Sequence, residues 1–393
     1  MQTEHKIVIG WDIGGAHVKA VMLHVYPNGT QQVAHVLQLP CPLWRGLDQL
    51  SVAIAEVEKA WQLSNFYSDG SIDHAITMTG ELVDLFENRQ QGVLAISECL
   101  ETQLVGKKHF FVMQPNTHLT EGYAFVPFEQ VASAWQSIAS ANWFASAQWI
   151  AKHVGNALLI DIGSTTADFV LMQNHTVLSL KDKTDGLTDA ARMQQQTLIY
   201  TGVVRTPLMA FTQEIPFLGK PTTIAAEYFA TAADVYRMTQ DLDPSDDMAE
   251  TADGKDKSVL ATAKRLARMV GHDVTDATMT DWQALAHAFK AVQLQRLYQV
   301  AKQHLHATAW QGPVSIVGAG VGRFLAAEVA TLCHVSYISA AEAINHGMPN
   351  QNAFTHTASK VSISDFSTTD VCFPAYAVAA LLLQTVESFE CIE

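Results

Sequence analysis

The sequence has few charged residues, little positive charge and no long hydrophobic run. Charged residues make up 16% of its 393 positions, and the formal net charge is −15 at pH 7. Nucleic acids and anionic membranes attract basic surfaces, so this balance argues against both as partners. The longest apolar run, over residues 375–383, is too short to cross a bilayer as a helix. We therefore expect neither a membrane span nor a nucleic-acid interface.

Cysteine is also rare, and its spacing fits neither a metal site nor a disulfide framework. The five cysteines stand singly along the chain, without a CxxC pair. Isolated cysteines are typical of reduced thiols in a cytoplasmic protein. A first strand is expected directly after six N-terminal residues, which leaves no room for a signal peptide. Both features predict a cytoplasmic location.

Apolar residues are abundant, and one apolar stretch is interrupted by a polar turn. Hydrophobic residues make up 48% of the sequence, which is long enough for two domains with their own cores. Residues 157–170 contain an apolar run, a turn of glycine and hydroxyl residues, and a second apolar run. Backbone N–H groups at such a turn can converge on an anion, and Asp161 or Asp168 could hold a bridging Mg²⁺. Taken alone, the same pattern also fits an ordinary hairpin.

A second copy of this layout favours the anion site. Near the N-terminus, an apolar run reaches Asp12-Ile13-Gly14, turns through Gly15 and Ala16, and continues as an apolar run. The two Asp-Ile-Gly triplets lie about 150 residues apart, roughly one domain length, which indicates an internal duplication. A third glycine-rich turn, over residues 318–322, follows another apolar run.

These three turns, in this order, resemble the two phosphate loops and the adenosine-type loop of the actin/sugar-kinase/heat-shock-ATPase superfamily. The resemblance implies an α/β protein with the actin-like ATPase (ribonuclease H-like) fold, in which two related domains flank a cleft. We expect the first domain over residues 1–156 and the second over residues 157–393. A helical insertion that sets substrate specificity is expected at about residues 185–290.

Two acidic residues follow the strand expected over residues 73–78. Glu81 and Asp84 stand where this strand gives way to a predicted helix. Residues at the carboxyl ends of strands line the ligand crevice of open α/β sheets. Alternatively, the two acids only complement the dipole in the first turn of the helix. The sequence leaves both interpretations open.

Further candidates lie in predicted helices and loops. A helical stretch over residues 128–153 carries Asn142 near its middle, where an amide can bind a ligand or satisfy a core hydrogen bond. Arg205 follows a glycine turn and could hold an anion through both ends of its guanidinium, or be a surface arginine. The acid-rich residues 239–257 predict a solvated loop, and residues 365–370 predict a polar turn.

Several short motifs resemble a narrower group within the superfamily. They are residues 12–19, 79–82, 141–143, 161–168, 200–207, 251–255 and 265–269. Together they look like the hydantoinase A-like (hydantoinase/oxoprolinase-related) proteins linked to the tetrahydromethanopterin one-carbon pathway. The resemblance implies a transferase in methanofuran or methylofuran biosynthesis. It would join aminomethylfuranmethanol diphosphate to a phenol, namely tyrosine, tyramine or a glutamyl derivative, and release diphosphate.

The resemblance also implies roles for individual residues. Charge on the departing diphosphate would be stabilised by backbone donors, Lys19 and Mg²⁺. A phenol, with a pKa of about 10, needs a base as the C–O bond forms. The candidates are Glu81, Asp84 and Asp168 for the base; Lys19 for the leaving group; Asp12 and Asp161 for Mg²⁺; Gly14, Gly15, Ala16, His17, Lys19, Gly163, Ser164, Thr165 and Thr166 for diphosphate; and Asn142, Arg205, Asp253, Gly318 and Gly320 for the remaining substrate.

Two other functions on the same scaffold stay open. An ATP-dependent kinase or ligase would seat adenosine at Gly318 and Gly320, and ATP is expected as a cofactor only in that case. A non-catalytic nucleotide-sensing regulator would carry a DNA-binding arm or a basic extension, and the sequence has neither. The expected partners are small molecules, and the oligomeric state is open, with a homodimer among the possibilities.

Overall fold

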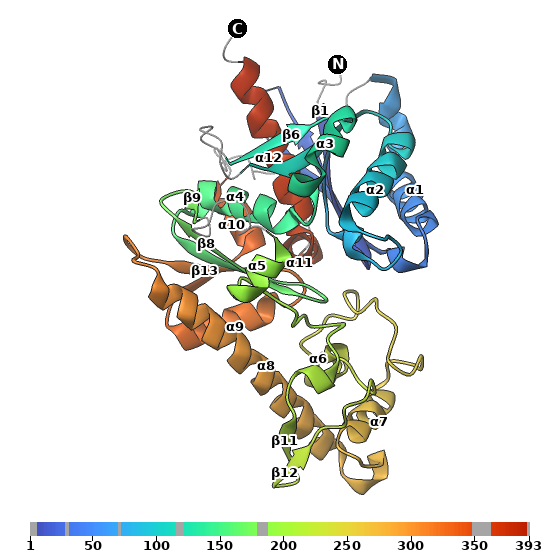
Figure 1. The fold of residues 1–393 in the computed structure, drawn as a ribbon, viewed down its shortest axis with the longest axis vertical. Helices are drawn as coiled ribbons and strands as arrows, with labels where there is room; N and C mark the ends of the chain where they lie inside the picture. The colour runs from blue at the N-terminus through green and yellow to red at the C-terminus, as the bar shows by residue number, and fades with distance from the viewer. Residues whose placement is uncertain are drawn as a thin grey trace. The chain divides into compact units, whose positions relative to one another are not determined.

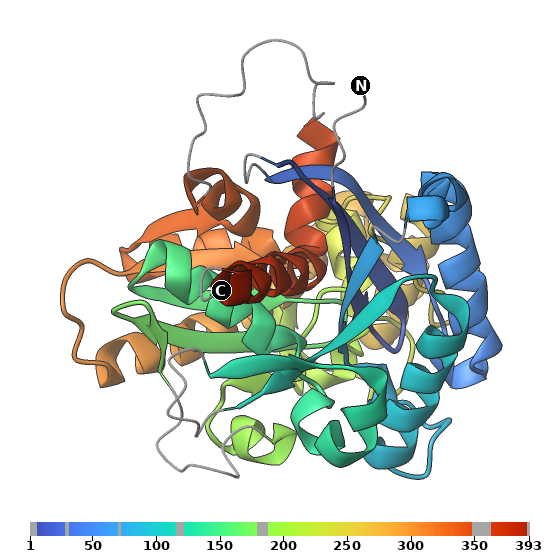
Figure 2. The ribbon, with the colours of Figure 1, turned by 90° about the horizontal axis from the view of Figure 1, so that it is seen from above.

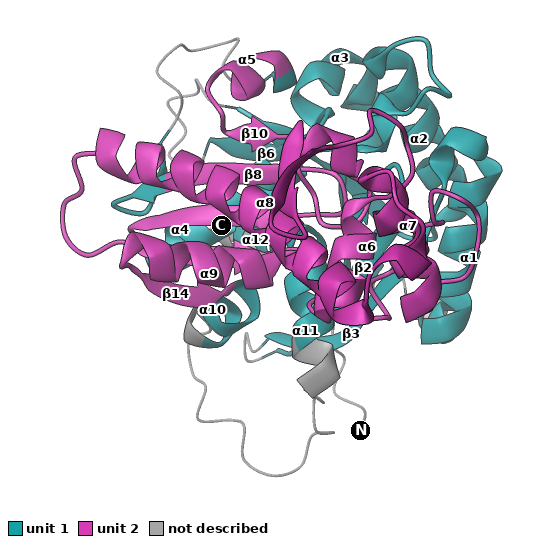
Figure 3. Cartoon of the chain, turned by 90° about the horizontal axis from the view of Figure 1, so that it is seen from below, with its two compact units in different colours: residues 1–155, 172–189, 340–393 teal, residues 156–171, 190–339 magenta. Residues whose placement is uncertain are grey.

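The computed structural model describes residues 6–27, 31–69, 72–114, 122–178, 188–347 and 363–390. The chain forms two compact units, shown in teal and magenta in Figure 3. Unit 1 comprises residues 1–155, 172–189 and 340–393, and unit 2 comprises residues 156–171 and 190–339. The chain first passes from unit 1 to unit 2 between residues 155 and 156, next to the boundary expected at residue 156. The C-terminal residues, which we expected in the second domain, belong instead to unit 1.

Unit 1 is built on a six-stranded sheet of order β3-β2-β1-β4-β5-β6. Strand β1 pairs antiparallel with β2 and parallel with β4, which is in turn parallel to β5. The outer pairs β2–β3 and β5–β6 are antiparallel. The central strands are buried along nearly their whole length, as a sheet covered on both faces requires. The strands are β1 (Lys6–Ile13), β2 (His17–Val25), β3 (Gln31–Pro40), β4 (Ile72–Met78), β5 (Lys107–Met113) and β6 (Tyr123–Val126).

The C-terminal helix α12 explains why the end of the chain belongs to unit 1. It contacts β1, β2, β4 and helix α4, as Figures 1 and 2 show. Its described side chains are buried on all sides from Phe373 to Leu383, as expected of a core helix. The other helical segments of unit 1 are η1 (Leu43–Arg45), α1 (Asp48–Trp61), η2 (Leu63–Asp69), η3 (Gly80–Leu82), α2 (Arg89–Gln103), α3 (Phe128–Ile138), α4 (Asn142–Val154), α10 (Ala340–Gly347) and α11 (Ile363–Val371); α12 spans Phe373–Glu390, and the short strand β9 spans Thr176–Val177.

Unit 2 repeats the plan of unit 1. Its sheet has the order β10-β8-β7-β13-β14, with β7, β13 and β14 parallel. In both units a hairpin is followed by parallel strands added beside its first strand, which confirms the predicted α/β class and actin-like fold. The elements are β7 (Ala157–Ile162), β8 (Ala167–Gln173), α5 (Asp189–Gln194), β10 (Leu198–Ile199), η4 (Leu208–Ala210), β11 (Glu214–Phe217), β12 (Lys220–Thr223), α6 (Ala232–Thr239), α7 (Val259–Met269), η5 (Val274–Asp276), α8 (Met279–Ala307), β13 (Ser315–Ala319), α9 (Arg323–Cys333) and β14 (Ser336–Ser339).

Four local expectations were wrong. The helix expected over residues 128–153 is broken after α3, where Ser140 adopts a left-handed conformation with φ of 52°. Glu81 lies in the single turn η3, because Val83 is extended and the next α-helix begins only at Arg89. Residues 365–370 lie within α11 and form no turn. The acid-rich loop is partly buried, because Arg237 and Lys257 form ion pairs with Asp247.

The described residues contain neither a membrane-spanning helix nor a disulfide. None of the helices found there is long and apolar enough to cross a membrane. The four cysteines within those ranges, at positions 41, 99, 333 and 372, form no disulfide with one another.

Candidate functional site

In unit 1, the first hairpin places Asp12 opposite Lys19. The two residues are direct partners in the antiparallel register of β1 and β2, on either side of the turn at Gly14 and Gly15. Lys19 Nζ lies 3.5 Å from Asp12 Oδ2. Asp12 is 2% exposed, and burial raises the pKa of its carboxyl group, an effect that Lys19 and Asn142 partly oppose. The turn therefore carries a lysine at its edge and a buried carboxylate beneath it.

The break between α3 and α4 supplies polar groups to two carboxylates of unit 1. Ser140 Oγ donates a hydrogen bond to Glu81 Oε1 over 2.7 Å. Two residues later, Asn142 Nδ2 donates to Asp12 Oδ1 over 3.4 Å, while its Oδ1 accepts from the backbone of Trp143. A continuous helix would point these two side chains about 200° apart, since successive residues turn by 100°. The left-handed Ser140 instead allows both to serve the end of the central strands.

Glu81 is almost completely enclosed, with 1% of its surface exposed. Burial raises the pKa of its side chain to about 7, although the Ser140 hydroxyl favours the charged form. Its Oε2 has no hydrogen-bond partner among the described residues. A carboxyl group with a pKa near neutrality can accept and return a proton at physiological pH. Glu81 thus has the titration expected of a catalytic acid or base.

In unit 2, the second hairpin holds its two acids differently. The turn is closed by a hydrogen bond from Gly163 N to Thr166 O over 2.8 Å. Asp168 accepts a charge-assisted hydrogen bond from Arg192 of α5, whose side chain is 2% exposed. Asp161 is partly buried, and a Cβ atom at Gly320 would overlap its carboxylate. The structure therefore brings Asp161, the hairpin turn and the third glycine turn together within unit 2.

The other candidates are less closely associated with the hairpins. Asp84 is exposed beyond η3. Arg205 is exposed, although its backbone N–H donates to Ser164 O over 2.8 Å. Asp253 is bound by Arg265 of α7, which is fully buried and also forms an ion pair with Asp234. Gly318 is buried within β13, where a Cβ atom would meet the ring of Tyr337.

A Mg²⁺ ion at these turns would depend on the oxygen ligands that the candidate residues offer. Among the described residues, no group of three or more His, Cys, Asp and Glu side chains could hold a metal ion. Mg²⁺ usually keeps several waters and binds one or two carboxylates together with substrate phosphates. Asp12 in unit 1 and Asp161 in unit 2 each offer a single carboxylate beside a glycine turn, which suits such a site at either turn. Asp12 also contacts the Lys19 ammonium, which would compete with a directly bound cation.

Comparison with known proteins identifies the family. A profile described as hydantoinase/oxoprolinase matches residues 73–345, more than half of the chain. The chain belongs to the hydantoinase/oxoprolinase family. The (4-{4-[2-(gamma-L-glutamylamino)ethyl]phenoxymethyl}furan-2-yl)methanamine synthase of Methanocaldococcus jannaschii is 27% identical over 268 residues, 68% of this chain and 72% of the relative. The synthase of that name from Methanococcus vannielii is 28% identical over 129 residues, 33% of this chain and 55% of the relative.

Solved structures show more distant similarity to this hydantoinase/oxoprolinase protein. Nucleotide-free acetone carboxylase is 10% identical, with a TM-score of 0.49 over 96% of this chain and 70% of that chain. The activator of 2-hydroxyisocaproyl-CoA dehydratase from Clostridium difficile is 12% identical, with a TM-score of 0.41 over 98% of each chain.

Sequence reasoning missed three residues that hold the candidate groups in place. Ser140 and Arg192 bind Glu81 and Asp168, and Gln293 of α8 binds the segment beside the second hairpin. Each partner lies at least 24 residues away from the group it binds, so no local motif connects the two. The one local signal overlooked was Asn88, a preferred N-cap residue whose side chain accepts from Gln91 N at the start of α2.

Proposed function

We propose that this protein is a transferase that forms an aryl ether with release of diphosphate. Its substrates would be aminomethylfuranmethanol diphosphate and a phenol, namely tyrosine, tyramine or a glutamyl derivative. The observation that carries the proposal is the 27% identity over 268 residues to a synthase whose name describes a phenoxymethyl-furan amine. The glycine turn of unit 1, beside Lys19, supports the proposal, because backbone N–H groups and a lysine at such a turn could stabilise a diphosphate leaving group.

The proposed reaction balances without ATP or a redox partner. The bond between the furan-methyl carbon and the diphosphate oxygen breaks, and diphosphate leaves with the electron pair. The phenol oxygen bonds to that carbon and loses its proton to a base on the protein. Because negative charge grows on the leaving group, Lys19 and the backbone N–H groups of the turns would stabilise the transition state more than the ground state.

Of the three candidate bases, Glu81 has the environment that suits the role. Its pKa of about 7 lies near the operating pH, where general bases are most effective. Asp168 is bound by Arg192, and Asp84 is exposed. Because Glu81 itself is buried, we assign the transfer to a relay, in which the Ser140 hydroxyl takes the phenol proton and passes its own to Glu81 Oε1.

Mg²⁺ is part of this proposal as a charge-neutralising ion. Asp12 in unit 1 and Asp161 in unit 2 are each candidate ligands that would hold it with water and phosphate oxygens, and it would lower the negative charge on the departing diphosphate. Asn142 would act indirectly, since its amide donates to Asp12. Arg205 is positioned by its backbone beside Ser164 and would contact an anionic part of a substrate.

The test is direct. Purified protein is incubated with aminomethylfuranmethanol diphosphate, Mg²⁺ and each phenol in turn, without ATP. We expect diphosphate release in a colorimetric assay and one equivalent of aryl ether by mass spectrometry. Release only after addition of ATP would identify a kinase or ligase instead. If no phenol is consumed, the proposed function is wrong for this protein.

A further inference from the structure

A short segment of unit 2 holds the tip of the second hairpin from one side. This segment, residues 201–205, is called the strap here. Gly202 N donates to Thr165 O over 2.9 Å, and Val203 N donates to Gly163 O over 3.1 Å. Val204 N and Arg205 N both donate to Ser164 O, over 3.1 and 2.8 Å. Four successive N–H groups of the strap thus bind three successive carbonyl groups of the hairpin.

Because peptide groups are planar, these hydrogen bonds also determine the orientation of the hairpin N–H groups. In a trans peptide, the C=O of one residue and the N–H of the next point in opposite directions. Since the carbonyl groups of residues 163–165 point toward the strap, the N–H groups of Ser164, Thr165 and Thr166 point away from it. Successive N–H groups on one side of a turn make an anion-binding surface. The strap therefore orients the donors that would meet a phosphate.

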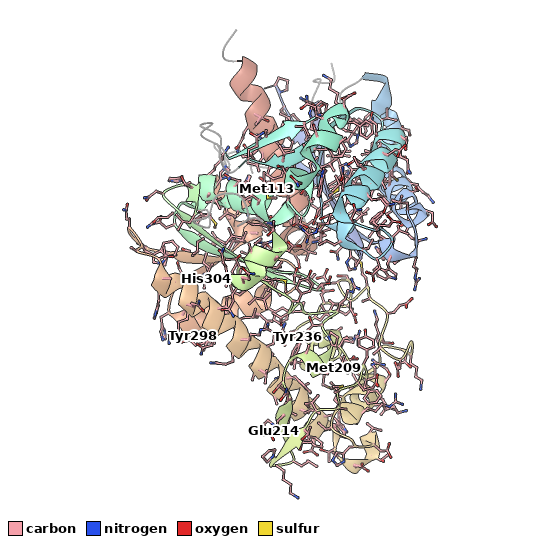
Figure 4. All side chains as sticks on the ribbon, viewed as in Figure 1. Met113, Met209, Glu214, Tyr236, Tyr298 and His304 are labelled. Carbon is pink, nitrogen blue, oxygen red and sulfur yellow. The ribbon has the colours of Figure 1, made fainter. Side chains whose placement is uncertain are left out.

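The strap is in turn held by one buried side chain. Gln293 of α8 is 1% exposed, and its Nε2 donates to Thr201 O over 2.9 Å and to Gly202 O over 3.2 Å. Its Oε1 accepts a short hydrogen bond from the hydroxyl of Tyr236, which lies on α6 and is labelled in Figure 4. Both ends of the amide are therefore bound, so its orientation is fixed.

We propose that Gln293 is a positioning residue for anion binding at the second hairpin. It fixes the strap, and the strap orients the hairpin N–H groups toward a phosphate group. The inference rests on the proposed function only for the identity of the anion, diphosphate.

The first hairpin has the same construction in unit 1. Leu43 N donates to Gly15 O over 3.0 Å, and Cys41 N donates to Ala16 O over 2.8 Å. By the same planarity, the N–H groups of Ala16 and His17 point away from residues 41–43. Two unrelated segments thus bind the carbonyl groups of the two duplicated turns. This repetition indicates that holding the carbonyl groups is part of how each turn works.

Gly202 is the point at which strap and hairpin come closest. A Cβ atom there would overlap the backbone of Ser164 and Thr165. Its φ is not in the left-handed region, so space alone requires glycine. Gly202→Ala should therefore separate the strap from the hairpin while the Gln293 side chain is kept, which gives a second way to test the proposal.

The experiment compares Gln293→Leu and Gly202→Ala with a matched control. Trp282→Phe also removes a hydrogen bond from a buried side chain to a backbone carbonyl, the partly buried one of Val274, but it lies three turns away on the same helix. Binding of inorganic diphosphate with Mg²⁺ is measured by calorimetry, and hydrogen exchange is measured for a peptide covering residues 160–169. We expect the dissociation constant to rise at least about tenfold, which corresponds to 1.4 kcal/mol, with faster exchange in this peptide. The control should change neither.

The outcomes separate this inference from the proposed function. Unchanged diphosphate affinity in both folded variants, or an equal loss in Trp282→Phe, would overturn the positioning role. If the wild-type protein binds diphosphate and the variants do not, the inference holds even when no aryl ether is formed. If Gln293→Leu forms the ether at the wild-type rate, the inference fails while the proposed function stands.

Discussion

Among single residues, Glu81 should have the strongest effect on how stability depends on pH. Burial raises the pKa of its side chain from an ordinary 4.5 to about 7. A group with a raised pKa binds a proton on folding, so its contribution is greatest below pH 4.5 and is lost as pH rises through 7. Between these limits we expect wild-type protein to lose about 3 kcal/mol relative to Glu81→Gln. Urea unfolding at several pH values measures this difference.

The control for this prediction is Asp84→Asn. Asp84 is exposed three residues further along the chain, so its substitution should leave the pH dependence of unfolding as in wild type. Parallel curves for wild type and Glu81→Gln would contradict the enclosed environment of Glu81. The same comparison tests the hydrogen bond on which the proposed relay depends, because Ser140→Ala removes the hydroxyl that favours the charged carboxylate and should raise the pKa of Glu81 further.

Lys19 should matter for the chemical step more than for binding of the phenol. Its ammonium lies at the hairpin turn and would interact with charge that grows on the leaving group. We expect Lys19→Ala to lower kcat for ether formation by about 100-fold, in the range found when one charge-stabilising donor is removed. The KM for the phenol should change by no more than about twofold. Steady-state kinetics with each substrate varied in turn provides the measurement.

Lys6→Ala is the matched control for Lys19. Lys6 also forms an ion pair with an aspartate, Asp73, but it lies at the opposite end of β1. Its loss should leave kcat unchanged. A Lys19→Ala variant with weakened phenol binding and normal kcat would place the lysine at the phenol instead of the diphosphate.

At the scale of elements, the sequence predicts structure where the signal is local. Both hairpins and the third glycine turn were found because each turn is contiguous with the elements that it joins, and glycine marks each turn. The break at Ser140 was missed because nothing in its neighbours opposes a helix, and its polar partner, Glu81, is 59 residues away. Arg192 and Gln293 were missed for the same reason, because the groups that they bind lie far away along the sequence. The turns were therefore predictable from the sequence, while the residues that hold their candidate groups in place were not.

The close contact between β1 and α12 leads to a prediction about the stability of the protein. Gly10 faces α12 so closely that an added Cβ atom would overlap the carbonyl of Ala375. Gly10→Ala should force the two elements apart and destabilise the protein by about 1–3 kcal/mol. Hydrogen exchange should increase in residues 373–383. Gly219→Ala, a substitution in unit 2 with no neighbouring atom within 4 Å, should leave that exchange unchanged; an identical pattern in both variants would argue against the contact.

At the scale of the whole molecule, the sequence revealed the duplication but missed the return of the chain to unit 1. Repetition is visible in the residues themselves, since each unit carries its own Asp-Ile-Gly turn. The docking of α12 on β1 depends on shape complementarity between segments at opposite ends of the chain. The sequence of an apolar helix predicts that the helix is buried, but it does not predict which sheet the helix packs against.

Truncation should show that unit 1 needs both ends of the chain. A protein ending at residue 371 lacks α12 and would expose the apolar surface of β1, β2 and β4. We expect it to lose near-UV circular dichroism and cooperative thermal unfolding, and to bind the dye ANS. A protein lacking only residues 391–393 should behave as wild type. Cooperative unfolding of the shorter protein would mean that α12 is dispensable for the core.

The position of α12 also affects how the protein can be synthesised. Strand β1 leaves the ribosome before the helix that covers it, which follows about 360 residues later. At a translation rate of roughly 5–20 residues per second, α12 is synthesised about 20–70 s after β1. During translation, an apolar surface of an early-made sheet is thus exposed to other nascent chains. The nascent chain should accordingly require a holding chaperone until α12 has been synthesised.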